Sequence, residues 1–364
     1  MENRKYTVLV VDDSFFMTQF ISDLLHQDPD IQVIGTAFNG AEALEKAEKL
    51  GPDVITMDVE MPVMNGLEAL REIMRKTPTP VIMLSNCTQI GAEATIKALE
   101  LGAVDFVTKP SGQISLDLEK VQDELIKKVK IAADAKKMLY PGNRVINEGL
   151  RAQNKKTENE KTARDDGILF QGFNPARMKV VAIGASTGGP KALQTILPQL
   201  PEEFPAAVIV AQHMPSGFTR SLASRLNEVC SLAVKEAEDG ERLRPGTVYI
   251  SPGGWHTVIW EDSAGCFVRL QENKPPTGNC PSIDTMMASL ARCKVSKIGL
   301  LLTGMGKDGV IGLQQIQANG GLTIVEDKST CIIFGMPKAA IENGCADYVV
   351  PVSDVAKLLL ELLN

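Results

Sequence analysis

Short hydrophobic runs alternate along the chain with segments whose apolar residues recur every three or four positions. The runs are typical of buried strands, and the three-to-four spacing is typical of helices that pack by one face. Because the connections are short, this alternation predicts a parallel sheet with helices on both faces. In the first third the predicted strands are Tyr6–Val11, Ile31–Phe38, Val54–Met57, Val81–Leu84 and Asp105–Val107, and the predicted helices are Phe15–His26, Ala41–Leu50, Leu67–Lys76, Ala92–Leu101 and one that begins near Leu116.

The pattern loosens from about Lys127, and residues 141–177 are charged with few large apolar side chains, which predicts a linker. A second α/β region begins at Lys179, with a β-rich insertion expected around Ser251–Leu270. Its predicted strands include Val180–Ile183, Ala207–Ala211, Val248–Ile250, Ile298–Leu302 and Leu322–Val325. We therefore expect two doubly wound α/β domains: a flavodoxin-like (βα)5 domain at 1–126, a linker at 127–176, and a second parallel-sheet domain with a small β-hairpin insertion at 177–364.

Composition narrows the class of protein. A formal net charge of −7 gives no electrostatic footprint for nucleic acid or for an anionic membrane. No apolar run approaches the length of a membrane span, and the N-terminus has no signal-peptide core. The seven cysteines are odd in number and form no CxxC pair, which argues against structural zinc and a disulfide framework. A cytoplasmic protein is the expected reading.

Polar residues follow four of the first five predicted strands: Asp12 and Asp13, Asp58, Ser85, and Lys109. Residues that follow parallel strands meet at one edge of the sheet. Three carboxylates there repel one another unless a cation lies among them, and hard oxygen ligands suit Mg²⁺. A metal, a lysine and a hydroxyl together offset the charge of a transferred phosphoryl group, which leaves a carboxylate as the nucleophile. The alternative, an aspartate that caps the next helix, explains Asp13 alone.

Residues 1 to about 125 resemble the receiver domain of two-component response regulators. The stretches that carry the resemblance are Val8 to Ser14, Met57 to Gly66, Leu84-Ser85 and Lys109-Pro110. It implies phosphorylation of Asp58 by a partner histidine kinase, with Mg²⁺ held by Asp12, Asp13 and Asp58. Phe106 occupies the position of the family's aromatic switch residue, beside the switch positions Ser85 and Lys109; the alternative is an apolar strand residue.

A second set of polar residues follows strands in the second half. Residues 184–188 read G-x-S-x-G between a strand and a helix, a turn that exposes the hydroxyl of Ser186 and directs backbone N–H groups toward an oxyanion. Taken alone, this turn also fits a serine or threonine helix cap. His213 ends the next strand and is a credible base, and Asp308, after the strand Ile298–Leu302, is placed to orient the imidazole.

Two other readings of this half are weighed, and the first, membership of the α/β-hydrolases, is rejected on chain order. The chain order serine, histidine, aspartate differs from the serine, acid, histidine order of α/β-hydrolases. A dinucleotide-binding loop is the strongest rival, because Gly304, Gly306 and Gly309 spell G-x-G-x-x-G. Glu326 then lies near the place of a ribose-binding acid, but Asp308 would face the pyrophosphate, and Ser186 and His213 would have no role.

The second half resembles the catalytic domain of the chemotaxis-specific protein-glutamate methylesterase family, CheB. The motifs that carry the resemblance are Gly184 to Pro190, Gln212 to Pro215, Ser251 to His256, Pro281 to Asp284 and Thr303 to Gly309. The resemblance implies a triad of Ser186, His213 and Asp308, with Thr187 and the backbone of Met305 binding the oxyanion. Cys280 stands where relatives often carry arginine, and His256 fits a structural turn at least as well as catalysis.

The two resemblances together imply a phosphorylation-activated hydrolase without a cofactor at the esterase site. Its expected substrates are glutamate methyl esters, and specific glutamines, on chemoreceptors. The implied partners are those receptors and the chemotaxis histidine kinase, with no nucleic acid and with membrane contact only through the receptors. The rival from another class is a receiver-controlled module whose second domain only binds a partner.

Overall fold

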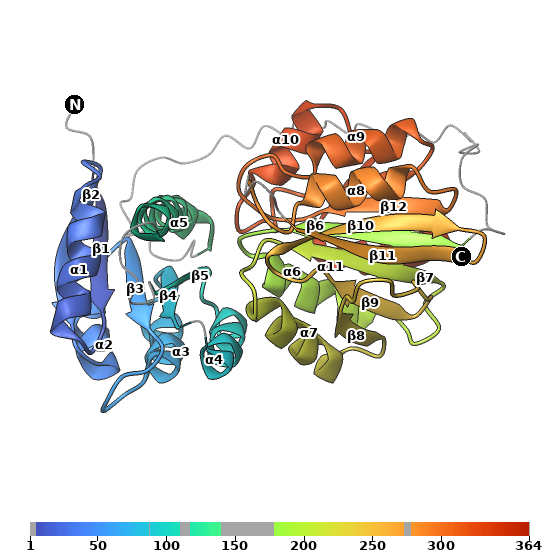
Figure 1. Ribbon diagram of the computed structural model, residues 1–364. Coiled ribbons are helices and arrows are strands. Elements are labelled where there is room, and N and C mark those ends of the chain that lie inside the picture. The colour runs from blue at the N-terminus through green and yellow to red at the C-terminus, as the bar shows by residue number, and fades with distance from the viewer. Residues whose placement is uncertain (1–4, 87, 110–116, 140–177, 273–277, 364) are drawn as a thin grey trace.

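The computed structural model describes residues 5–86, 88–109, 117–139, 178–272 and 278–363. These residues form two α/β units, each built on its own parallel sheet (Figure 1). The two predicted doubly wound sheets are therefore confirmed. No helix in the described ranges is both long enough and apolar enough to cross a membrane.

The first unit has a five-stranded sheet in the flavodoxin-like order 2-1-3-4-5. In that order its strands are β2 (Ile31–Ala37), β1 (Tyr6–Val11), β3 (Val54–Asp58), β4 (Val81–Ser85) and β5 (Asp105–Thr108). Every pairing is parallel, and β3 is buried along its whole length, as expected for a strand covered on both faces. The helices are α1 (Phe15–His26) and α5 (Asp117–Leu139), which contact each other, and α2 (Gly40–Leu50), α3 (Gly66–Lys76) and α4 (Gln89–Glu100), which form a second row.

The last helix of the first unit is longer than the sequence pattern indicated. Helix α5 continues to Leu139, so residues 127–139, which we had assigned to the linker, are helical. Beyond residue 127, the buried side chains of α5 are the small Val129, Ala132 and Ala135, interspersed with lysines, and this gives a weak hydrophobic period. Residues 140–177, the rest of the expected linker, lie outside the described residues.

The second unit has seven parallel strands in the order β14-β13-β12-β6-β7-β9-β8. One face is covered by α6 (Gly189–Ile196), α7 (Phe218–Val229) and α11 (Val352–Leu363) (Figure 1). The other face is covered by α8 (Ile283–Ala291), α9 (Val310–Ala318) and α10 (Met336–Glu342). A short 3-10 helix at Leu197–Gln199 follows α6 directly. The strands are β14 (Tyr348–Val350), β13 (Leu322–Glu326), β12 (Ser296–Leu301), β6 (Lys179–Ala185), β7 (Ala206–Gln212), β9 (Thr247–Ile250) and β8 (Ala233–Glu236).

An antiparallel hairpin is inserted after β9, as the sequence predicted. Its strands are β10 (Trp255–Asp262) and β11 (Gly265–Glu272), and β10 packs against α8. The short strands β8 and β14 were not predicted, because runs of three or four residues are too short to show a recognisable hydrophobic pattern.

The two units meet where α4 of the first packs against α6 and α7 of the second (Figure 1). Glu100, at the end of α4, forms an ion pair with Arg225 of α7 and accepts a hydrogen bond from Gln194 of α6 at 3.0 Å. Phe106 of β5 stacks on Phe218 of α7, with ring centroids 4.5 Å apart. Aromatic pairs in this geometry add roughly 0.5–1.5 kcal/mol to the free energy of area burial. The interface therefore combines an apolar contact with a polar rim.

Helices α8 and α9 approach each other closely at Gly312. A Cβ atom built on Gly312 would lie 2.5 Å from the Cβ of Met287 and 3.3 Å from the Cα of Asp284. Replacing an exposed helix-interior glycine by alanine usually stabilises a helix by about 0.5–1 kcal/mol. Here the added methyl group would force the two helices apart, so we expect the replacement to destabilise the protein.

We expect Gly312→Ala to lower the free energy of unfolding of the second unit by about 1–3 kcal/mol through overpacking. Both tryptophans, Trp255 and Trp260, lie in β10, so urea unfolding followed by tryptophan fluorescence reports on this unit. The control is Gln314→Ala on the exposed side of the same helix, which is expected to change the unfolding free energy by less than about 0.5 kcal/mol. A Gly312→Ala protein as stable as this control would contradict the close approach.

Candidate functional site

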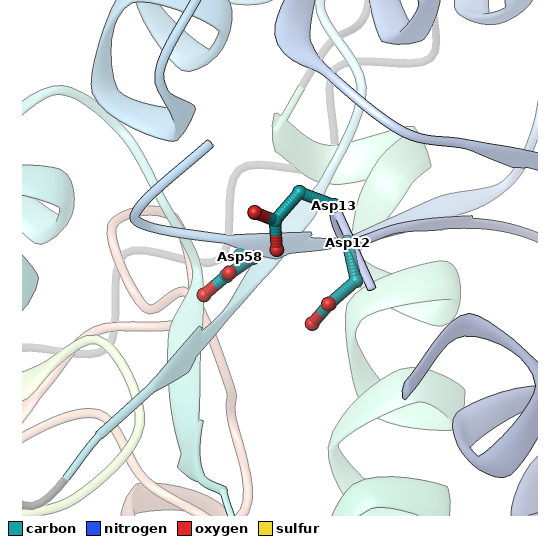
Figure 2. Close-up of side chains that lie close together, drawn as sticks. All are labelled: Asp12, Asp13 and Asp58. Atoms are coloured by element: carbon teal, nitrogen blue, oxygen red, sulfur yellow. The ribbon is translucent and has the colours of Figure 1, made fainter. Parts of the chain in front are cut away.

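The carboxylates predicted to meet at the first sheet edge do so. Asp12 and Asp13 follow β1 and Asp58 ends β3, and Figure 2 shows their side chains gathered at the ends of these strands. One ligand oxygen from each lies within 4.8 Å of the other two. Ser14 caps helix α1 by accepting the backbone N–H of Met17, so Asp13 is not needed as the cap. The donor set of three carboxylate oxygens fits a hard divalent cation such as Mg²⁺.

Lys109 connects two of these carboxylates. Its Nζ lies 2.7 Å from Oδ2 of Asp12 and 2.8 Å from Oδ1 of Asp58. Burial raises the pKa of Asp58 above its usual range, against the opposing effect of Lys109. Burial alone would lower the pKa of Lys109, but hydrogen bonds to Asp12 and Asp58 outweigh it and raise that pKa. One cation thus faces three acids, and the excess negative charge favours a metal ion.

The other two predicted switch residues lie on the side of the sheet that meets the second unit. The hydroxyl of Ser85 donates to the backbone carbonyl of Gly91 at 3.1 Å and accepts from Thr95 Oγ1 at 2.7 Å, both in α4. It is therefore bound to α4 and not to the Asp58 carboxylate. Phe106 is 3% exposed, because its ring is covered by Phe218 of the second unit.

At the second edge, the strands β12, β6 and β7 are neighbours, and the chain crosses from one half of the sheet to the other at β6. Open α/β sheets bind ligands at such a switch point. Ser186 directly follows β6; its backbone N–H donates to the Thr303 carbonyl at 3.0 Å, and its own carbonyl accepts from Gln212 Nε2 at 2.9 Å. A Cβ on Gly304 would lie 2.7 Å from the Cβ of Ser186, so this position has no room for a larger residue.

His213 and Asp308 come together beside this turn, as predicted. Nε2 of His213 lies 2.7 Å from Oδ2 of Asp308. The Asp308 carboxylate also accepts the backbone N–H groups of Ile283 at 2.9 Å and Asp284 at 2.8 Å. Burial would raise the pKa of Asp308, but the hydrogen bonds and the charge of His213 outweigh it, so the pKa lies below the usual range. The carboxylate is thus held ionised next to the imidazole.

The second ring nitrogen of His213 faces away from Asp308. Nδ1 lies 3.3 Å from Nδ2 of Asn279. If the proton is on Nε2, which faces the carboxylate, Nδ1 is an acceptor and the Asn279 amide donates to it. The Ser186 hydroxyl makes no side-chain hydrogen bond within the described ranges. For His213 to act as a general base on Ser186, the Nδ1 lone pair that faces Asn279 has to accept the hydroxyl proton instead.

Thr187 and Met305 lie on the two loops that flank Ser186. In the described part of the chain, the backbone N–H of neither residue has a hydrogen-bond acceptor. Free N–H groups of this kind are the donors that an oxyanion site needs. The Thr187 side chain, however, is 8% exposed, and its hydroxyl donates to Oδ2 of Asp105 in the first unit. The first unit therefore binds the residue next to Ser186.

Glu326, the acid of the dinucleotide alternative, points into the protein. Its carboxylate accepts the backbone N–H of Thr303 at 2.7 Å and the hydroxyl of Thr330 at 3.0 Å. Burial raises its pKa above the usual range. The acid anchors the end of β12 and does not face the sheet edge, where a ribose would lie. This geometry counts against dinucleotide binding.

Three residues of the site, Gln212, Asp105 and Asp284, had no role assigned from the sequence, and His256 had two candidate roles, a structural turn and catalysis. Gln212 ties the carbonyls of Ser186 and His213, and Asp105 binds Thr187. Asp284 lies next to Asp308, and His256 accepts the N–H of Ser282 through Nδ1 at 3.2 Å, a contact inside the turn. The motifs 212–215 and 281–284 pointed to this region, but their spacing alone did not show which atoms would meet.

Comparison with known proteins agrees with both halves. Residues 8–119 match the family model described as response regulator receiver domain, and residues 181–359 match the model described as CheB methylesterase. Curated relatives named protein-glutamate methylesterase/protein-glutamine glutaminase include those of Geobacillus kaustophilus, 48% identical over 98% of both chains, and Thermotoga maritima, 45% identical over 100% of both chains.

A solved structure is also similar. The crystal structure of the Thermotoga maritima CheB methylesterase catalytic domain is 47% identical, with a TM-score of 0.50, and the match covers 51% of this chain and 98% of that one. The structure has two sheets whose edges carry different chemistry, and relatives that share one name match the chain along nearly its whole length. Both observations point to one family. The chain belongs to the CheB family of protein-glutamate methylesterases/protein-glutamine glutaminases, with a response-regulator receiver domain ahead of the methylesterase domain.

Proposed function

We propose that the protein removes methyl groups from glutamate methyl esters of chemoreceptors, and deamidates specific receptor glutamines, under control of phosphorylation at Asp58. The observation that carries the proposal is the pairing of His213 with a buried, ionised Asp308 on the strands that flank the Ser186 turn. Family membership supplies the reaction class, a hydrolase acting on protein glutamate esters and glutamines. Such an enzyme adapts a chemotaxis signal, and we assign it to the cytoplasm.

In the proposed reaction, Ser186 Oγ attacks the ester or amide carbonyl and His213 Nδ1 takes its proton. Asp308 holds the imidazole in the Nε2–H tautomer and stabilises the imidazolium that forms. The backbone N–H groups of Thr187 and Met305 donate to the oxyanion. His213 then gives the proton to the leaving methanol or ammonia, and water releases the glutamate by the reverse sequence. No cofactor is proposed for these steps.

For the receiver, we propose Asp58 as the phosphoryl acceptor, with Asp12, Asp13 and Asp58 as the residues that would hold Mg²⁺. When bound, the ion offsets charge on the transferred phosphoryl group. Lys109 is placed to bind a phosphoryl oxygen through its ammonium group. The histidine kinase of the chemotaxis system is the proposed donor. We divide the chain into a receiver that extends from 1–126, the range expected from the sequence, to the end of its last helix at Leu139, a linker after that helix, and the catalytic domain at 177–364.

We propose that the arrangement of the two units represents the inhibited state. Asp105 engages Thr187, next to the nucleophile, and Phe106 and Glu100 dock on α7. In this proposal, the receiver bound to Thr187 keeps a receptor helix from Ser186. A phosphoryl group on Asp58 would compete with Gly91 for the Ser85 hydroxyl, and so loosen α4 from the sheet. A closed state favoured by only ~1.4 kcal/mol leaves about one molecule in ten open.

Ser186→Ala and His213→Ala should each reduce methanol release from methylated receptor membranes by on the order of 10⁶-fold, and Asp308→Asn by about 10⁴-fold. The acid costs less because it orients the base and does not react. The exposed Ser353→Ala in α11 is the matched control and should keep the wild-type rate. Full activity in Ser186→Ala would exclude the serine hydrolase mechanism and favour a module that only binds a partner.

A small phosphodonor with Mg²⁺ should raise the rate of the wild-type protein and leave Asp58→Asn at its resting rate, because only Asp58 offers the acceptor oxygen. The control is Glu60→Gln, an exposed acid two positions further on, which should respond as strongly as wild type. The acceptor is misassigned if the Asp58→Asn rate rises with phosphodonor as much as the control does.

A fragment that begins near Pro175 should be faster than the unphosphorylated whole protein and indifferent to phosphodonor. A relative's catalytic domain has been crystallised on its own, so such a fragment is expected to fold.

In the full chain, Arg225→Ala should raise the resting rate of methanol release about 1.5- to 5-fold, the range that follows from a surface ion pair worth about 0.2–1 kcal/mol.

The matched control for this experiment is Arg220→Ala on the same helix, whose ion pair with Glu236 stays within the second unit. Its resting rate should not change. A fragment no faster than the resting protein would show that the receiver activates by assisting catalysis or docking, and that it does not act by uncovering Ser186.

A further inference from the structure

Helices α8 and α9 begin side by side, and an aspartate at the start of each accepts backbone N–H groups at the start of the other. Asp308, just before α9, accepts the first N–H groups of α8 from Ile283 and Asp284. Asp284, in the first turn of α8, accepts N–H groups of α9: Gly309 at 2.9 Å and Gly312 at 2.7 Å, both on Oδ1. Carboxylates are stabilised at helix N-termini by the free N–H groups and by the helix dipole. The two caps are thus reciprocal.

The two carboxylates are not equivalent. Asp308 directs Oδ2 at His213, whereas Asp284 has no contact with Ser186 or His213. Burial, together with the charge of Asp308, raises the pKa of Asp284, and the pKa of Asp308 is lowered. The pKa values of the two carboxyl groups are therefore shifted in opposite directions, and the lower one belongs to the group that faces the imidazole.

The turn that carries Asp308 is bound to the start of α8 at two points. The Asp308 carboxylate accepts two backbone N–H groups of α8 and the Ser282 hydroxyl at 3.3 Å, and the backbone N–H of the next residue donates to Asp284. Gly309, the next residue, has a φ of 97°, and a Cβ there would lie 2.5 Å from Leu301 Cδ1 and 2.8 Å from Ile283 Cγ2. Only glycine fits at this position, because the φ is positive and there is no room for a Cβ atom. Gly309 therefore has no side chain that could pack and hold the turn in place. The Asp284 carboxylate holds this residue through its N–H group.

We propose that Asp284 is a positioning residue for the esterase reaction, which fixes the Asp308 turn by binding the N–H groups of Gly309 and Gly312. This inference rests on the proposed function, in which Asp308 orients His213. Asp284 touches neither substrate nor the reacting atoms. A displacement of about 1 Å in a catalytic group can cost on the order of 10²-fold in rate. Loss of the two hydrogen bonds should therefore reduce kcat while KM stays the same.

The test is a double-mutant cycle on the full-length protein with phosphodonor, in which methanol release from methylated receptor membranes is measured. Asp284→Ala should lower kcat about 10²-fold and change KM by less than about twofold. In an Asp308→Asn background the same change should cost less than about threefold, because the orientation it protects is already lost. Asp284→Asn retains the Oδ1 acceptor and should recover most of the kcat.

The matched control is Asp347→Ala. Asp347 accepts the N–H and the hydroxyl of Thr323, both at 2.8 Å, and a side-chain N–H of Gln317 at 2.8 Å, so its loss removes at least as many hydrogen bonds in the same domain. Thr323 lies at the beginning of β13, whereas Asp308 follows the end of β12, the neighbouring parallel strand. Its kcat should stay within about twofold of wild type. If Asp284 has a purely structural role, Asp284→Ala should lower kcat by the same factor in the wild-type protein and in Asp308→Asn. That result would overturn the proposal.

Two further outcomes are distinguishable. If tryptophan fluorescence shows that Asp284→Ala does not fold, Asp284→Glu replaces it, since it keeps the carboxylate but moves it by one methylene. A wild-type kcat for a folded Asp284→Glu, or an equal loss with and without Asp308→Asn, would overturn the positioning role. If Asp308→Asn itself retains full kcat, the proposed triad fails, and the inference about Asp284 fails with it for that separate reason.

Discussion

Parallel pairing of β12, β6 and β7 is the constraint on which the catalytic half depends. It brings the residues that follow three strands, far apart in sequence, to one edge of the sheet. The pairing continues past the strands: the Ser186 N–H donates to Thr303 after β12, and the His213 N–H donates to Ala185 at the end of β6. Positions of the candidate nucleophile and base are thereby fixed by main-chain hydrogen bonds. Side chains then need only to be oriented, which Gln212, Asp308 and the two helix N-termini do.

The receiver half uses the same sheet geometry for a different purpose. Its edge concentrates negative charge around Lys109, and its β4–α4–β5 side is turned to the other unit. Ser85 lies between the two, because it ends β4, beside Asp58 in the sheet, and is hydrogen-bonded to α4. A charge added at Asp58 is therefore only one hydroxyl away from the helix that docks on α7. Control through α4, as proposed, needs no long pathway between the two sites.

Much of the fold could be predicted from the sequence because its local signals agree. Helix α1 was predicted with the bounds that the structure shows, since Ser14 caps it and an apolar period follows. The residues at the strand ends were predictable because parallel strands bring their carboxyl ends together. The end of α5 was not, because small residues such as Ala132 and Ala135 carry little hydrophobic contrast. Contacts such as Asp105 with Thr187, 82 positions apart, depend on domain docking, and those of Asp284 with α9 depend on a helix crossing that no local pattern encodes.

Thr187 belongs to two arrangements at once, since its hydroxyl binds Asp105 while its N–H is left for an oxyanion. In the proposed mechanism, a receptor segment seated at Ser186 and a receiver seated on Thr187 exclude each other. Thermodynamic linkage makes such exclusion reciprocal. If the open state binds the receptor more tightly than the closed state, then receptor binding shifts the equilibrium toward the open state by the same factor. Methylated receptor is then an effector of its own enzyme.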